Sequence, residues 1–362
     1  MRHLLTVVGA VACVLALWGG GARAAEGPDA KLVEAFRADC AAKAAAAEKV
    51  DMMTVVGKQG WLFLGKELRH LGVGEFWGEK AAKVTSAAKP EWADPLPAIL
   101  DFKAQMDKMG IELILLPVPP KAVIYPDMVC DAVKAGTGSR PRMDTAHQGF
   151  YALLRKSGVK VLDLTDEFLA RRTDKEGAVF CKQDTHWSGA ACVLAARRIA
   201  GEIRDRPWLK AAPKLDLASA TRPLELQGDL WKMLPGAQGP RETIRIRVVG
   251  TKDVASLTPV EPDRASPIVL LGDSHNLIFH AGDDMQAKGA GLADQLAMEL
   301  RLAVDLIGVR GSGATPARVN LLRRARADSG YLAGKKLVLW CFGAREFTES
   351  AGWRKVPIVK SK

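Results

Sequence analysis

Residues 268–275 read Ile268-Val269-Leu270-Leu271-Gly272-Asp273-Ser274-His275, and this stretch decides the fold class. Four consecutive apolar residues, typical of a strand buried on both faces, run directly into a Gly-Asp-Ser turn. In open α/β sheets, catalytic and ligand-binding groups collect at the carboxyl ends of such strands. The stretch therefore predicts a parallel strand with Ser274 at its carboxyl end. A turn that merely ends the strand is the alternative that the tripeptide leaves open.

The rest of the chain repeats this strand pattern and places helices between most of the strands. Further strands are predicted at residues 111–118, 159–164, 303–309 and 337–342. Helices are predicted at residues 25–50, 97–109, 143–156, 188–204 and 292–302, and two short strands flank a glycine turn within 55–64. Apolar strands that alternate with helices indicate an α/β fold, with helices on both faces of a mostly parallel sheet.

The N-terminal residues show the charged, apolar and small-residue regions of a secretory signal peptide, in the usual order. Arg2 and His3 precede an apolar run at 4–18, and Ala22-Arg23-Ala24 supplies a small-x-small cleavage site. The run is short for a membrane span, which needs about 20 apolar residues. We expect a signal peptide at 1–24, with an uncleaved inner-membrane anchor as the alternative, and a periplasmic location. Residues 25–362 are then expected to form one domain, with a polar, irregular insertion at about 207–263.

The charge of the chain favours acidic partners. Its formal net charge is +11, and loss of Arg2 and Arg23 with the leader leaves about +9. A basic exported protein suits a uronate-rich polysaccharide, anionic lipid headgroups or cell-wall phosphate. Nucleic acid is a less suitable partner, because the sequence has no nucleic-acid recognition motif and an exported protein does not reach the compartment that holds nucleic acid.

The cysteines give no metal site and no disulfide pattern. Five cysteines remain after the predicted leader: Cys40, Cys130, Cys181, Cys192 and Cys341. Because five is an odd number, at least one thiol is free or pairs between chains. Their pairing is left open. Because no second His or Cys stands at metal-ligand spacing, a metal-dependent hydrolase is the least supported class, and neither a metal nor another cofactor is expected.

A serine nucleophile needs a base, and His186 has the most informative setting. It lies in Asp184-Thr185-His186-Trp187-Ser188, where Ser188 can cap the helix that follows. A carboxylate two residues before the histidine can fix its tautomer and leave the other ring nitrogen free for the serine proton. A metal half-site and a structural turn are the alternatives for this loop.

Candidate oxyanion and substrate-binding residues follow the last two predicted strands. Gly311 and Gly313 lie in a glycine-rich turn, where backbone N–H groups can approach a developing oxyanion because no Cβ intervenes. Arg345 would lie near the same rim. His70 could line the site or be exposed, whereas His147 is expected on the polar face of a helix.

Four segments of the chain, taken in their sequence order, resemble the alginate O-acetylation family of AlgJ and AlgX. The segments are Gly57-Lys58-Gln59-Gly60-Trp61-Leu62-Phe63-Leu64 with Glu67-Leu68-Arg69-His70, Pro117-Val118-Pro119-Pro120-Lys121 with Tyr125-Pro126, Asp184-Thr185-His186-Trp187, and Gly272-Asp273-Ser274-His275. Asp-x-His precedes the serine, a circularly permuted order relative to ordinary SGNH esterases. The similarity runs from about residue 50 to 355. It implies an SGNH-hydrolase-like three-layer α/β/α domain.

The resemblance also implies roles. Ser274 would be the nucleophile, His186 the general base and Asp184 its orienting group, with an acetyl-serine intermediate and transfer to a hydroxyl of an exported polysaccharide. A membrane-bound O-acyltransferase would supply the acetyl group. Because the last predicted strand ends near the end of the chain, we expect no separate carbohydrate-binding module and expect help from a partner complex. A polysaccharide acetyl esterase and a non-catalytic scaffold subunit are the competing functions.

Overall fold

The computed structural model describes residues 28–134, 141–237, 239–252 and 257–359. The predicted signal peptide at 1–24 lies outside these residues. Within them, no helix combines the length and the apolar character that crossing a membrane requires. The five cysteines beyond the leader all fall within the described residues, where each is buried and none forms a disulfide.

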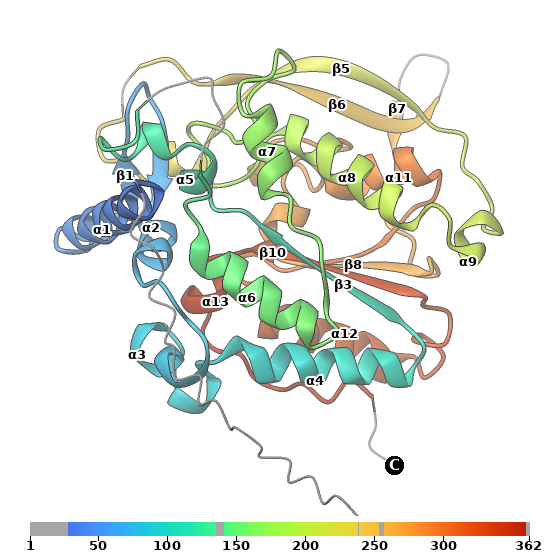
Figure 1. Cartoon of the computed structure of the whole chain (residues 1–362). Coiled ribbons are helices and arrows are strands. Elements are labelled where there is room, and N and C mark those ends of the chain that lie inside the picture. The colour runs from blue at the N-terminus through green and yellow to red at the C-terminus, as the bar shows by residue number, and fades with distance from the viewer. Residues whose placement is uncertain (1–27, 135–140, 238, 253–256, 360–362) are drawn as a thin grey trace, which may run out of the picture.

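A five-stranded parallel sheet forms the centre of the molecule (Figure 1). Its strands, in spatial order, are β4 (Lys160–Val161), β3 (Glu112–Val118), β10 (Leu337–Gly343), β8 (Ile268–Gly272) and β9 (Asp305–Gly308). Every neighbouring pair is parallel. All five predicted strands are present, although β4 keeps only two residues of the expected 159–164. The last strand in the chain, β10, lies between β3 and β8.

Alternate residues of each strand pack into two different cores. In β8, Ile268 and Leu270 join one apolar cluster, whereas Val269 and Leu271 join the other. Because strand side chains alternate between the two faces, a run of apolar residues is buried only when helices cover both faces. The three-layer α/β/α fold that the sequence predicts is therefore confirmed.

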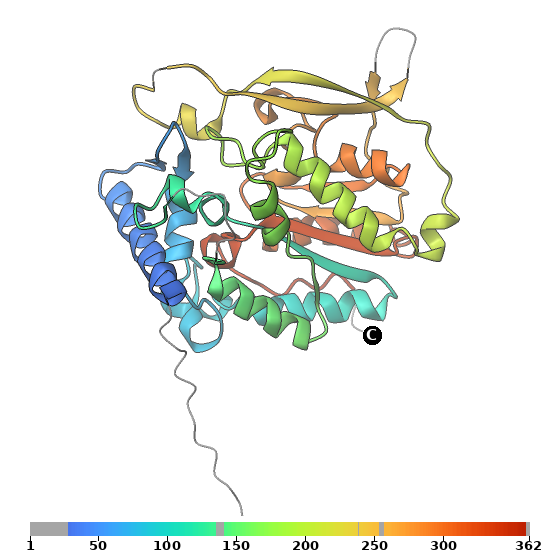
Figure 2. The ribbon, with the colours of Figure 1, turned by 45° about the horizontal axis from the view of Figure 1, so that its top comes forward.

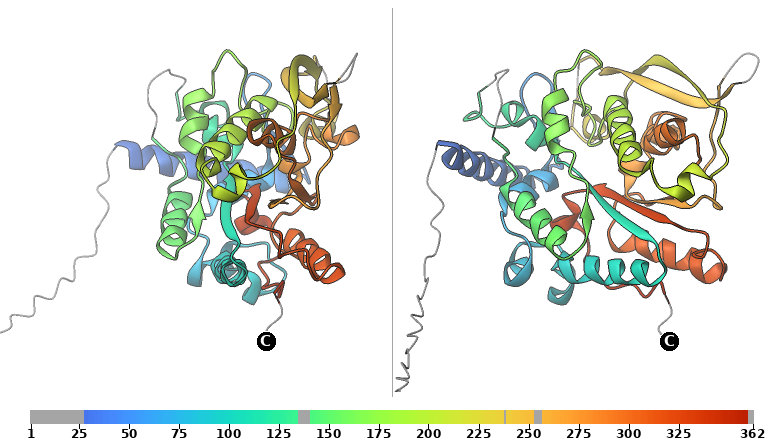
Figure 3. Two further views of the ribbon diagram at one scale, coloured as in Figure 1. Left: turned by 90° about the vertical axis from the view of Figure 1, so that its right-hand side faces the viewer. Right: turned by 45° about the vertical axis from the view of Figure 1, so that its right-hand side comes forward.

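Helices cover both faces of the sheet (Figure 3). On one face lie α4 (Pro95–Lys108), α6 (Thr145–Lys156) and α12 (Thr315–Ala327), and on the other lie α8 (Gly189–Ile203) and α11 (Leu292–Leu300). Capping residues mark both ends of α4. The carboxylate of Asp94 accepts from the Leu96 N–H at the start of α4, and Gly110 follows its end with a left-handed φ of 68°.

Further elements surround this frame. A helix, a two-stranded ribbon and a second helix form one edge: α1 (Pro28–Glu48), β1 (Thr54–Val56), β2 (Leu62–Leu64) and α2 (Gly65–Gly72). Short helices fill the connections: α3 (Ala81–Val84), α5 (Lys121–Ile124), α7 (Thr165–Arg171), α9 (Pro207–Lys210), α10 (Asp229–Lys232) and α13 (Glu346–Glu349).

The segment at about 207–263 has more regular structure than its composition indicates. It forms a three-stranded antiparallel sheet of β5 (Ala218–Glu225), β6 (Thr243–Lys252) and β7 (Leu257–Pro259). Figure 2 shows this sheet lying over α8 and α11, and β6 contacts both helices. Sequence periodicity does not reveal β5, because nearly all of its residues are exposed and it contains Pro223. A strand without a buried face leaves no alternation of apolar residues to detect.

The carboxyl ends of the parallel strands bring four chemistry-bearing positions to one edge of the sheet. Lys121 follows β3, Ser274 follows β8, Gly313 follows β9 and Arg345 follows β10. Ligands in open α/β sheets bind at this edge, next to the point where the strand order reverses. The candidate site is therefore assembled from segments that lie far apart in the sequence.

Candidate active site

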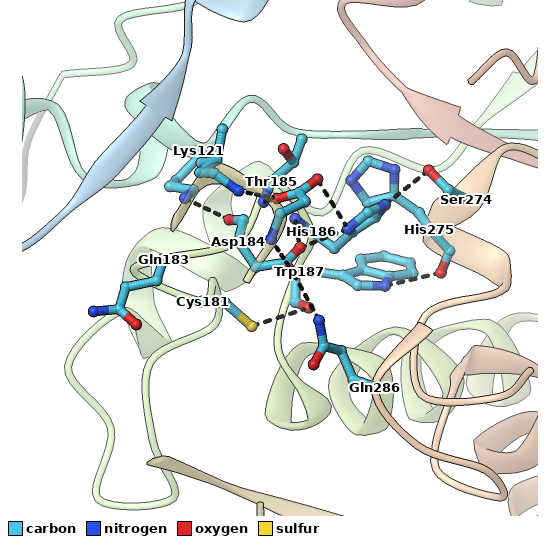
Figure 4. A network of polar contacts seen from close by, with 12 residues as sticks. Lys121, Cys181, Gln183, Asp184, Thr185, His186, Trp187, Ser274, His275 and Gln286 are labelled. Carbon is cyan, nitrogen blue, oxygen red and sulfur yellow. Dashed lines mark hydrogen bonds and ion pairs between the residues drawn. The ribbon is translucent and has the colours of Figure 1, made fainter. Parts of the chain in front are cut away.

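Ser274, His186 and Asp184 form a hydrogen-bonded chain (Figure 4). The distance from His186 Nε2 to Ser274 Oγ is 2.7 Å, and His186 Nδ1 lies 2.6 Å from Asp184 Oδ1. Ser274 is 8% exposed, so its hydroxyl lies at the edge of the protein interior, while the two other side chains are buried. The structure thus brings together the three residues that the sequence singles out, in the arrangement that a nucleophile, its base and an orienting carboxylate require.

The turn after β8 holds Ser274 in place. Gly272 is required there, because a Cβ would lie 1.6 Å from the carbonyl oxygen of Cys341 on β10. The Asn276 side chain donates to that same carbonyl at 2.8 Å, and Asp273 accepts from the Gly343 N–H at 2.7 Å. These bonds tie the serine turn to the end of the neighbouring strand, so the position of Ser274 depends on β10 as well as on β8.

Lys121 positions the segment that carries the base. It is 1% exposed, and its ammonium group donates to the carbonyl oxygens of Leu62 at 2.7 Å and Asp184 at 2.6 Å. Its backbone N–H donates to Glu67. Burial lowers the pKa of Lys121, while the nearby charge of Glu67 opposes that shift. Sequence reasoning placed Lys121 only within a family motif, although a lysine directly after a buried strand is itself a signal for this edge.

Two residues outside any sequence motif complete the surroundings of Asp184. Its Oδ2 accepts from the Asp229 N–H at 3.1 Å and from the Gln286 side chain at 3.3 Å. The Asp229 carboxylate accepts from the Thr185 N–H at 2.6 Å. Sequence reasoning missed Asp229 and Gln286, because both reach the loop from distant segments and neither follows a strand of the central sheet.

The environment of the pair favours a charged carboxylate and a basic imidazole. Burial would raise the pKa of Asp184, but the charge and hydrogen bonds of His186 hold that pKa well below its ordinary value. Burial lowers the pKa of His186, and the charge of Asp184 and its hydrogen bond more than offset this, so the pKa of His186 is raised. A raised pKa makes the imidazole a stronger base toward the serine hydroxyl.

Asp184, His186 and Asp229 could also provide metal ligands, since one ligand atom from each lies within 4.8 Å of the others. The separation of 2.6 Å between His186 Nδ1 and Asp184 Oδ1 is that of a hydrogen bond. A proton in that bond occupies the nitrogen lone pair that a metal would need. The chemistry of this group therefore fits a hydrogen-bonded base better than a metal half-site.

The two predicted glycines have different surroundings. A Cβ on Gly313 would lie 2.7 Å from the backbone nitrogen of Asp273, so this glycine packs directly against the peptide that precedes Ser274. Gly311 is exposed, with a left-handed φ of 88° and nothing within 4 Å of the position of a Cβ. Gly313 therefore stays a candidate for the oxyanion site, and Gly311 has the features of a turn residue.

Arg345 lies beside the serine turn. The position of a Cβ on Gly343 is 2.8 Å from its Nη1 and 3.2 Å from Cε1 of His275, so both side chains approach this glycine. Nη1 of Arg345 is buried and has no hydrogen-bond partner in the described part of the chain. The neighbouring Glu346 accepts from the Ser312 hydroxyl at 2.6 Å, and burial raises the pKa of Glu346 to about 7. An unsatisfied, buried donor suits a substrate oxygen.

His70 belongs to a different cluster. Its Nε2 lies 2.7 Å from His147 Nε2, and its Nδ1 lies 2.8 Å from the Thr348 hydroxyl. Because both ring nitrogens of His70 are hydrogen-bonded to other protein groups, His70 is no longer a candidate oxyanion or substrate-binding residue. His147 is buried as well, so the expectation that it lies on the polar face of its helix is wrong. The aromatic rings of Phe76 and Phe347 surround the pair and account for its burial.

Comparisons with known proteins identify the family of the chain. A family model described as SGNH hydrolase-like domain, acetyltransferase AlgX, matches residues 54–343. The chain is 27% identical over 292 residues to a probable alginate O-acetylase AlgJ of Pseudomonas syringae pv. tomato, which covers 80% of this chain and 68% of that protein. It is also 27% identical over 181 residues to the probable alginate O-acetylase AlgJ of Pseudomonas aeruginosa. That match covers 50% of this chain and only 41% of the relative's length.

Solved structures share the fold. The O-acetyltransferase domain of Pseudomonas putida AlgJ matches with a TM-score of 0.59 at 21% identity, covering 82% of this chain and 92% of that one. Pseudomonas aeruginosa AlgX matches with a TM-score of 0.55 at 17% identity, covering 82% of this chain and 66% of that one.

Proposed function

The chain belongs to the family of SGNH hydrolase-like domains described as acetyltransferase AlgX, and from this premise we propose that it is a serine-dependent O-acetyltransferase acting on hydroxyl groups of an exported polysaccharide. The observation that carries the proposal is the hydrogen bond of 2.7 Å between His186 Nε2 and Ser274 Oγ, with Asp184 on the other ring nitrogen. The relatives named as alginate O-acetylases support the substrate class.

The first half of the reaction forms an acetyl-serine. Ser274 Oγ attacks the carbonyl carbon of an acetyl ester or thioester while its proton moves to His186 Nε2. The C–O or C–S bond to the leaving group then breaks, and the leaving group takes that proton from His186. Asp184 holds the imidazole in the tautomer with hydrogen on Nδ1 and stabilises its charged form.

The second half transfers the acetyl group. A sugar hydroxyl gives its proton to His186 Nε2 and attacks the acetyl carbonyl carbon, and the released Ser274 oxygen takes the proton back. The oxyanion in each half would lie near Gly313, which packs against the serine turn without a Cβ, and near Nη1 of Arg345, which has no hydrogen-bond partner within the described residues. With water in place of the sugar, the same steps would give an acetyl esterase.

The donor and the location complete the proposal. A membrane-bound O-acyltransferase would pass the acetyl group to Ser274 in the periplasm, where a leader at 1–24 would direct or anchor the chain. The polysaccharide need not be alginate.

The test uses p-nitrophenyl acetate as donor, with and without a glycan acceptor. Mass spectrometry should find acetyl-Ser274, and acetylated glycan should form in the wild type but not in Ser274→Ala. Acetate as the only product, even with acceptor present, would identify an esterase instead. A folded wild type that gives neither turnover nor adduct would contradict the proposal and favour a scaffold role.

A further inference from the structure

A large groove lies outside the Ser274 site. It consists of two adjoining hollows of about 720 Å³ and 440 Å³ that share Lys175, Glu176, Gly177, Ala190 and Arg245 as lining residues. We call these two hollows the basic groove. Their sizes fall in the range of specific ligand sites.

The groove adjoins the catalytic segment without containing it. Gln183 and Ser188, which flank the Asp184–His186 loop, line the groove, whereas Ser274 does not. Figure 4 shows the Gln183 side chain directed away from Ser274. Strand β6 and the start of α8 meet here so closely that a Cβ on Gly189 would lie 3.0 Å from the Ile246 side chain. The groove therefore lies on the far side of the loop that holds the proposed base, where β6 meets the start of α8.

Positive charge dominates the lining. Seven basic side chains line the two hollows: Arg171, Lys175, Lys182, Arg197, Arg241, Arg245 and Arg247. Three acidic side chains accompany them: Asp174, Glu176 and Glu242. Burial raises the pKa of Glu242. The groove therefore carries an excess of positive charge.

Three of these cations form no ion pair with a carboxylate of the described residues. Arg171, Arg197, Arg241 and Arg247 each form an ion pair with Asp174, Glu299 or Glu225. Lys175, Lys182 and Arg245 form no ion pair with any residue that the structure describes. A cleft with an excess of cations attracts anionic ligands and raises their local concentration.

Two more features suit a carbohydrate that bears carboxylates. The first turn of α8, at Gly189 and Ala190, lines the groove, and the positive end of this 15-residue helix favours anions. Trp231 and Ile244 supply apolar surface in the larger hollow, where the C–H faces of sugar rings can pack. The groove thus combines charged and apolar lining residues.

We infer that the basic groove binds a uronate-containing stretch of the acceptor polysaccharide, through Lys175, Lys182 and Arg245. The inference rests on the proposed function for the nature of the acceptor and adds a second binding site on the same polymer. Holding one stretch of the chain in the groove keeps neighbouring sugar units close to Ser274 at a high effective concentration. This would let a catalytic site with a nearly buried serine act on a long polymer.

The experiment measures binding of fluorescently labelled hexagalacturonate to the full chain by anisotropy at low salt, without an acetyl donor. Lys175→Gln, Lys182→Gln and Arg245→Gln should each weaken binding by about two- to fivefold, the range for one solvent-accessible ion pair. The triple variant should weaken it by about tenfold or more. Higher ionic strength should weaken binding to the wild type, because salt screens exposed charges.

Arg222→Gln is the matched control. Arg222 lies on β5 of the same small sheet, is exposed and forms no ion pair within the described residues, but it does not line the groove. It should bind the labelled oligomer like the wild type. Labelled maltohexaose, which has no carboxylate, should bind at least about tenfold more weakly than hexagalacturonate. Thermal unfolding of each variant checks its fold, and the single variants carry the test if the triple variant unfolds.

Unchanged binding in the folded variants would overturn the inference, as would equal binding of maltohexaose. Groove-dependent binding to phosphatidylglycerol vesicles, with none to hexagalacturonate, would also overturn it in favour of a lipid site. Failure of the proposed function gives a different result: the groove would bind hexagalacturonate while no acetyl group passed through Ser274.

Discussion

Two turns in this protein have the same local structure and different surroundings. In Asp184-Thr185-His186 and in Asp273-Ser274-His275, one carboxylate oxygen of the aspartate accepts from both the backbone N–H and the ring Nδ1 of the histidine. The bonds to the N–H groups measure 3.0 and 2.9 Å. Only His186 then places its Nε2 on the Ser274 hydroxyl.

The charges around the two turns differ. Burial lowers the pKa of both histidines, but Asp184 and Asp229 together raise that of His186. For His275, the charges of His186 and Arg345 add to the effect of burial, and its pKa ends below the ordinary value. The Asp-x-His motif thus sets the tautomer, and the neighbouring groups decide which histidine is the stronger base.

The largest effect is expected where the first turn meets the serine. His186→Asn and Ser274→Ala should each lower kcat/KM for p-nitrophenyl acetate by about 10³-fold or more, because each removes a member of the nucleophile–base pair. Asn keeps a donor for Asp184, so the circular dichroism spectrum and the unfolding midpoint should stay near those of the wild type. Near-native turnover in either folded variant would remove that residue from the catalytic site.

Asp184→Asn should cost less, about a hundredfold, because its role is to orient and charge-stabilise His186. The pH profile gives a second readout. In the wild type, activity should fall as the pH drops through the raised pKa of His186, since the base is then protonated. Without the carboxylate that raises this pKa, the acid limb of kcat/KM should move to lower pH. An acid limb that stays in place would show that Asp184 does not tune the base.

Lys121→Met tests the lysine that anchors the Asp184-Thr185-His186 turn and that has no counterpart at the Asp273-Ser274-His275 turn within the described residues. The substitution leaves the carbonyl oxygens of Leu62 and Asp184 buried without their donor, which should lower the free energy of unfolding by about 2 kcal/mol. Urea titration measures the change. Exposed Lys66 on α2 provides the control, and Lys66→Met should shift the free energy by less than about 0.5 kcal/mol. Equal stability of Lys121→Met and wild type would contradict the anchoring role.

Sequence reasoning reached the parts of the molecule that depend on local pattern. The five strands and the residues Asp184, His186 and Ser274 follow from apolar runs and short polar turns at their ends. It missed contacts that fold topology creates, such as Asp229 and Gln286 on Asp184, because nothing in a local window marks them. It misjudged His70 for the same reason, since the burial of that ring depends on His147 and Thr348.

The smallest effect is expected in the second turn. His275→Asn makes the same change as His186→Asn and keeps a donor for Asp273, but it removes no proton-transfer group. We expect kcat/KM to fall by about fivefold, from the lost packing of the imidazole against His186 and Trp187. The acid limb of kcat/KM should stay in place, because the pKa of His275 is lowered while that of His186 is raised, so His275 is neutral where His186 takes up its proton. A loss as large as that of His186→Asn would mean that His275 takes part in proton transfer, and the two turns would then share the chemistry.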